Sequence, residues 1–244
     1  MPSRLALLVA LVFLLWPQVG ETSQLVVIES TTAELNPGQV VDGSKSLSLP
    51  AGVEVTLVGE DGKLTKLTGP FSGMPVGGNA ADGDKRVVAA LSRLFSTGAP
   101  GTSSLGAFRG YGGSIDGQGL NPPDVWAVNV YNSESLCIPE GVTPMLWRPD
   151  PGRDLSLIVL HLSTGKEGTV GFPASVHDMP WPKQVPILDG GEYSLRDGGN
   201  MWERKLVLKT VPKDLPTEAH GIAWMADNGC LRQAKAQVAK LASR

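Results

Sequence analysis

Alternation of apolar and polar residues predicts short β-strands in the first third of the chain. Val53, Val55 and Leu57 alternate with polar neighbours, a period of two that separates the two faces of a strand. Asp61-Gly62 follows, a dipeptide typical of the two-residue turn of a β-hairpin. With the β-branched run and the turns before it, this pattern predicts a small β-meander of about four strands within residues 24–78.

A helical period replaces this alternation in residues 79–97. Asp82 or Asp84 could cap the start of the helix. Its apolar side chains recur at a spacing that gathers them on one face, namely Val87, Val88, Leu91, Leu94 and Phe95. We expect this amphipathic helix to pack on the β-domain; a partner-binding helix is the alternative.

The second half of the chain again reads as short strands separated by turn residues. Strand candidates recur about every ten residues in residues 124–213, a spacing typical of a β-sandwich. Large aromatic side chains dominate core energetics, so we expect the main core here, where the chain after residue 16 places its tryptophans: Trp126, Trp147, Trp181, Trp202 and Trp224.

Residues 214–244 change to a helical period and predict a helical cap on the sandwich. Thr217 can cap a first helix and Gly229 can end it. The last helix carries an apolar stripe made of Cys230, Leu231, Ala234, Val238, Leu241 and Ala242. Arg232, Lys235 and Lys240 are expected to face away from it. The predicted fold is therefore mainly β, with a helix and a linker between two β-parts and helices at the end.

Residues 98–123 are rich in glycine and carry few charged or large apolar side chains. Ordering such a segment costs much chain entropy and buries little apolar surface, so we expect a flexible linker. A phosphate-binding loop is the alternative, but the Gly-Lys-Ser/Thr ending of that motif is missing.

The start of the chain has the parts of a secretory signal. Arg4 precedes the apolar run from Leu5 to Trp16, which is followed by small and polar residues. The run is too short to cross a membrane as a helix. We therefore expect a signal peptide within residues 1–23, a periplasmic or secreted protein, and no integral membrane span after its removal.

The charge balance argues against two classes of partner. Lys and Arg total 21 against 24 Asp and Glu, a net charge of -3. Such a balance gives no electrostatic attraction to nucleic acid or to anionic lipid. Another envelope protein or an envelope polymer is the partner that remains, and the oligomeric state stays open.

The turns and strands of "LNPGQVVDGSKSLSLPAGVEVTLVGEDGKLTKLTGP" resemble the FecR-type β-domain of bacterial envelope proteins. The ending from Trp224 to Ala234 also resembles the "W..dNGC..QA" ending of exported proteobacterial proteins of uncharacterised function. The resemblance implies a small β-domain and an envelope location. Signalling by the FecR route needs a membrane-spanning anchor, and residues 24–244 contain no apolar run of that length.

The two cysteines, Cys137 and Cys230, are predicted to form a disulfide bond. Export makes oxidation available, and a count of two leaves no cysteine over. Both positions are expected to point inward. Two free buried thiols, or a reactive thiol at Cys230, are the alternatives.

Metal and catalytic motifs are scarce. The three histidines have no partner at metal-ligand spacing and no Cys-x-x-Cys motif is present, so neither a metal nor another cofactor is expected. Trp147, Arg148, His177 and Trp181 could instead form an aromatic and cationic ligand-binding surface, with loop plugs over the sandwich as the alternative.

The sequence thus favours a non-enzymatic exported protein with a binding or assembly role. A hydrolase acting on an envelope polymer is the alternative, with a site around His177 and Asp178, which we expect in a loop.

Overall fold

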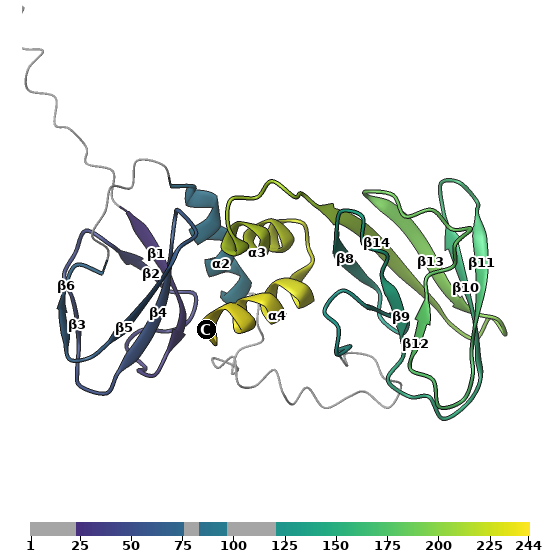
Figure 1. Ribbon diagram of the computed structural model, residues 1–244, viewed down its shortest axis with the longest axis horizontal. Coiled ribbons are helices and arrows are strands. Elements are labelled where there is room, and N and C mark those ends of the chain that lie inside the picture. Colours follow the sequence, from purple (N-terminus) through teal and green to yellow (C-terminus); the bar gives the residue numbers. More distant parts are fainter. Residues whose placement is uncertain (1–22, 76–82, 97–120) are drawn as a thin grey trace, which may run out of the picture.

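The computed structural model describes residues 23–75, 83–96 and 121–244. Figure 1 shows three parts in a row: an N-terminal β-part, a layer of helices, and a C-terminal β-part. The predicted signal peptide, apart from Ser23, and the glycine-rich part of the predicted linker lie outside the described residues.

The described residues of the N-terminal β-part form six strands, where about four were expected. A four-stranded antiparallel sheet has the order β2-β1-β4-β5, and β3 pairs with β6. The predicted hairpin at Asp61-Gly62 joins β4 to β5, and Gly62 adopts the left-handed conformation that this turn requires. The strands are β1 (Gln24–Ser30), β2 (Val40–Asp42), β3 (Leu47–Leu49), β4 (Glu54–Gly59), β5 (Leu64–Thr68) and β6 (Phe71–Gly73).

The C-terminal β-part contains a five-stranded sheet of order β11-β10-β13-β14-β8 and a three-stranded sheet of order β12-β9-β7. Apolar side chains from both sheets share one core, so the predicted sandwich is confirmed. Only β8 runs parallel to its partner β14 in the larger sheet. The strands are β7 (Val128–Asn129), β8 (Glu134–Pro139), β9 (Met145–Trp147), β10 (Leu155–His161), β11 (Glu167–Phe172), β12 (Asp178–Pro180), β13 (Gly191–Asp197) and β14 (Glu203–Val211).

Three described helices form the middle layer: α2 (Lys85–Ser96), α3 (Glu218–Asp227) and α4 (Leu231–Ala242). The predicted apolar stripe of α2 is buried except for Phe95, which is partly buried. Thr217 caps α3 by accepting from the N–H of His220. Asp84 caps α2, since its carboxylate accepts from the N–H of Arg86.

The helices at the end of the chain contact both β-parts. They touch β14 and β8, as a cap on the sandwich would, and they also pack on α2 and on β1. The core of this layer includes Val26, Ile28 and Val58 of the N-terminal sheet together with Cys137 of β8. In the described part of the chain, no helix is both long and apolar enough to span a bilayer.

Candidate functional site

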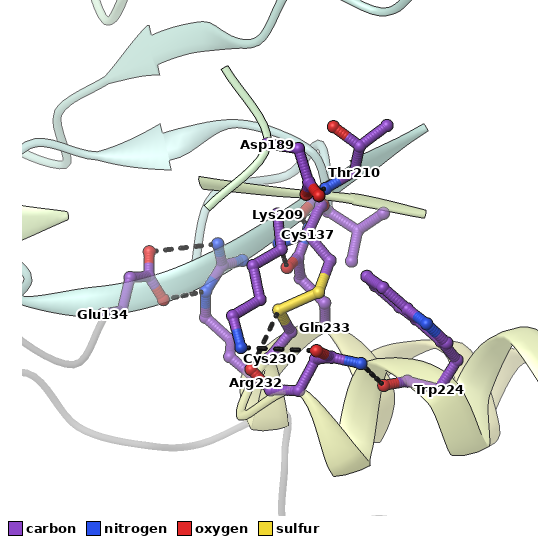
Figure 2. The surroundings of a disulfide bond; sticks show 11 residues. Glu134, Cys137, Asp189, Lys209, Thr210, Trp224, Cys230, Arg232 and Gln233 are labelled. Atoms are coloured by element: carbon purple, nitrogen blue, oxygen red, sulfur yellow. Dashed lines mark hydrogen bonds and ion pairs between the residues drawn. A yellow bond between two sulfur atoms is a disulfide. The ribbon is translucent and has the colours of Figure 1, made fainter. Parts of the chain in front are cut away.

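The junction between the helical layer and the C-terminal sheet joins distant parts of the chain through a disulfide bond, hydrogen bonds and an ion pair. Cys137 on β8 and Cys230, the residue before α4, form the predicted disulfide bond, with their Cα atoms 5.8 Å apart. Both cysteines are fully buried, and Figure 2 shows the bond between the strand and the helix. The bond covalently fixes the start of α4 to the edge of the sheet.

Gln233, in the first turn of α4, makes a second connection to the same strand. Its Oε1 accepts from the N–H of Cys137 at 2.6 Å, and its Nε2 donates to the carbonyl of Cys137 at 2.6 Å and to that of Val125 at 3.1 Å. Gln233 is fully buried. Its amide therefore satisfies the outer edge of β8 in the way that a neighbouring strand would.

Arg232 adds an ion pair beside the disulfide. Its Nε and Nη2 lie 2.9 and 3.2 Å from the two carboxylate oxygens of Glu134 on β8, and Nη2 also donates to the carbonyl of Ala127. The two side chains are only 16% and 14% exposed, so solvent screens this pair less than a surface pair. Figure 2 shows the bidentate geometry.

The turn between α3 and α4 brings these three side chains together. Gly229 adopts a positive φ of 81°, which ends α3 and lets the N–H of Cys230 bond to the carbonyl of Met225. Asn228 accepts from Nζ of Lys209 on β14 and donates to the carbonyl of Trp224. The ending noted in the sequence is thus a structural docking segment for the sheet.

Sequence reasoning missed two members of this junction. Arg232 was expected to face away from the buried stripe, and Leu231 was expected within it. The structure reverses both: Leu231 is 39% exposed, whereas the side chain of Arg232 is only 16% exposed and pairs with Glu134. Gln233, which lay outside the predicted stripe, is fully buried. The stripe is rotated because the start of α4 meets β8 while its later turns pack in the helical layer. No local pattern distinguishes Gln233 from an exposed glutamine.

Three of the four residues of the expected aromatic and cationic surface are buried, and only His177 is exposed. Trp147 and Trp181 are 7% and 4% exposed, and Arg148 is fully buried. The indole of Trp181 donates to the carbonyl of Val185 and packs edge-on against Tyr193. Trp181 and Tyr193 belong to the sandwich core, which agrees with the alternative of a structural plug.

Arg148 is a buried guanidinium held by main-chain carbonyls. It donates to the carbonyl oxygens of Arg153, Pro173 and Val176 at 2.6, 2.7 and 2.9 Å. Its guanidinium carbon also lies 5.2 Å from the centre of the Phe172 ring. Arg148 therefore ties two loops together from inside.

His177 and Asp178 do not form a buried acid–base pair. Both are exposed, and Nδ1 of His177 lies 2.9 Å from the carbonyl of Arg148. Asp178 begins the short strand β12, so the expected loop is wrong there. Among the described residues, no group of three or more His, Cys, Asp or Glu side chains could hold a metal ion.

A groove with a volume of about 600 Å³ lies between α2 and α3. It is lined by Arg86, Ala89, Arg93, Ala226 and Asp227. Arg93 pairs with Asp227, and Arg86 pairs with Asp84 and lowers the pKa of that carboxyl through its hydrogen bond. The four charges balance, so the groove has no net attraction for an anion.

Comparison with known protein families, curated proteins and solved structures finds no match.

Proposed function

We propose that this chain is an exported, non-catalytic protein of the bacterial envelope that binds or assembles other envelope components by holding two β-parts in a fixed arrangement. The observation that carries the proposal is the disulfide between Cys137 and Cys230. It joins the C-terminal sheet to a helical layer that also packs on the N-terminal sheet.

A disulfide bond supports export because such bonds persist in oxidising compartments. The basic and apolar start of the sequence and the FecR-type resemblance of residues 24–78 point to the same location. A fixed arrangement supports a scaffold, because a partner that touches both β-parts then meets a preorganised surface and loses less entropy on binding.

Fractionation of a Gram-negative host that expresses the full chain tests the location. We expect periplasmic protein that begins after residue 20 to 23 and that reacts with a maleimide only after reduction and unfolding. The matched control lacks residues 5–16; it should stay in the cytosol with two titratable thiols. Wild-type protein in the cytosol with an intact Met1 would contradict export.

Incubation with purified peptidoglycan separates a binder from the hydrolase alternative. A binder sediments with the polymer or with an envelope protein bound to it, and it releases no soluble fragments. Release of fragments that is lost in the His177→Ala variant would favour the hydrolase instead. The exposed Asp189→Ala variant is the control for a general effect of surface substitution. Its carboxylate accepts one hydrogen bond from the described residues, from the N–H of Thr210.

A further inference from the structure

We propose that the open edge of β11 pairs antiparallel with β11 of a second copy of this chain, centred on Thr169. The surface is the outermost strand of the five-stranded sheet, at the end of the molecule opposite the N-terminal β-part (Figure 1). This inference rests on the sheet edge alone and does not depend on export or on the proposed function.

The alternation of hydrogen-bonded and non-bonded residue pairs between β10 and β11 shows which main-chain groups of β11 face outward. The N–H of His161 donates to the carbonyl of Lys166, which makes these two residues a narrow pair of the β10–β11 ladder. Narrow and wide pairs alternate along an antiparallel ladder. Glu167, Thr169 and Gly171 therefore turn their N–H and C=O groups away from β10.

These outward groups are unpaired. The strand β12 contacts β11 but does not pair with its outer edge. Glu167, Thr169 and Gly171 are exposed, and within the described part of the chain their main-chain groups make no hydrogen bond on the outer side. A Cβ atom added to Gly171 would meet nothing within 4 Å, so the solvent face of the sheet is also uncovered at this residue. The strand spans about 20 Å and carries neither a proline nor a lysine, the residues that commonly protect an edge.

The other long edges of the two large sheets are protected. On β8, the amide of Gln233 already bonds the outer groups of Cys137. On β5, the outward residues are Leu64, Lys66 and Thr68, so pairing with a second copy about the middle of that strand would set two lysines opposite each other. The edge strand β2 has only three residues.

The charge pattern of β11 favours a second copy as the occupant. A two-fold axis at Thr169 places it opposite its own counterpart and sets Glu167 opposite Gly171 of the other copy, in both directions. Every outward group then finds a partner, the one acidic residue meets a glycine, and a Thr–Thr pair forms at the centre. A two-fold axis at any other residue of β11 would leave some outward groups without a partner or would place one of them opposite Pro173 of the other copy.

An edge of this length buries little surface, so the expected dimer is weak and depends on concentration. Sedimentation velocity of the purified, oxidised protein from micromolar to millimolar concentration should show a reversible monomer–dimer equilibrium. Thr169→Pro removes an outward N–H that has no partner within the chain, so it should abolish the dimer and leave the fold intact. Thr169→Lys is the second variant if the proline variant does not fold.

Cysteine cross-linking tests the register. Thr169→Cys should give a covalent dimer on oxidation, because the two residues face each other about 5.5 Å apart between Cα atoms. Glu167→Cys is the control: it is also exposed on the same strand, it removes an ion pair with Arg196, and it lies about 14 Å from its counterpart. A mixture of Glu167→Cys and Gly171→Cys chains should cross-link between the two kinds.

Two results would overturn the proposal. The first is a wild-type chain that stays monomeric at all concentrations, which would leave the edge to a strand of a different protein. The second is cross-linking of Glu167→Cys alone as fast as Thr169→Cys, which would indicate random collision.

Discussion

The hydroxyl of Thr217 donates a hydrogen bond of 3.3 Å to the carbonyl oxygen of Gly62, a residue 155 positions earlier in the chain. The start of α3 therefore rests on the β4–β5 turn of the N-terminal sheet. The last segment of the chain thus closes onto the first β-part as well as onto the sandwich.

Gly62→Ala should destabilise the protein more than Gly52→Ala. Both glycines have a positive φ, which costs an alanine about 1–2 kcal/mol. At Gly62 the added Cβ would also collide with Thr217 Oγ1 and lie 2.7 Å from Nδ1 of His220, whereas nothing lies within 4 Å at Gly52. Urea unfolding of both variants measures the difference. Equal losses would mean that α3 does not press on this turn.

Loss of the disulfide should sharply lower stability without changing the fold. The bond closes a loop across a sequence separation of 93, for which the chain-entropy model gives an upper figure of about 4–5 kcal/mol. The Cys137→Ser/Cys230→Ser variant should show this loss in urea unfolding, and reductant should add nothing to it. Near-ultraviolet circular dichroism checks that the tertiary packing persists. An unchanged midpoint would contradict a structural role for the bond.

Gln233→Ala tests the amide connection to β8. It leaves the N–H and carbonyl of Cys137 and the carbonyl of Val125 without their partner, at a cost on the order of 1–3 kcal/mol for each buried group that water cannot reach. Gln237→Ala is the matched control, because it removes the same side chain one turn later, where the described residues offer it no hydrogen bond. Thermal unfolding should separate the two variants clearly; similar melting temperatures would contradict the connection.

Local pattern was sufficient for some of these features and not for others. Alternation located the Asp61-Gly62 hairpin, and the count and placement of the cysteines predicted their bond, because both depend on near neighbours or on a simple constraint. Gln233 and Arg148 could not be found this way. Each is buried because carbonyl or amide groups from distant segments converge on it, and that convergence is a property of the assembled fold.

Stability should fall as the pH drops below about 4, the ordinary range of an aspartate. The hydrogen bond from Arg86 is the main cause that lowers the pKa of Asp84. A carboxyl whose pKa is lowered by folding stabilises the protein at pH values above its ordinary pKa of 3.8. This contribution is lost as the pH falls through the pKa of the folded state. Asp84→Asn can still cap α2, so its melting temperature should depend less on pH between 5 and 2.5. If the melting temperature of this variant fell with pH as steeply as that of the wild type, Asp84 would not be a source of the pH dependence.

Arg148 should be hard to replace even by lysine. Its planar guanidinium reaches the carbonyl oxygens of Arg153, Pro173 and Val176 at once, whereas a lysine ammonium is a compact donor on a flexible stem. Arg148→Lys keeps the charge but leaves carbonyls and a buried cation poorly bonded, so we expect a loss of at least about 2 kcal/mol in urea unfolding. Arg153→Lys is the control, because that side chain is exposed and only its main-chain carbonyl takes part. Arg148→Met removes the charge and the donors together; if it proves more stable than Arg148→Lys, the buried cation is the larger cost. A lysine variant as stable as wild type would show that charge alone holds the two loops.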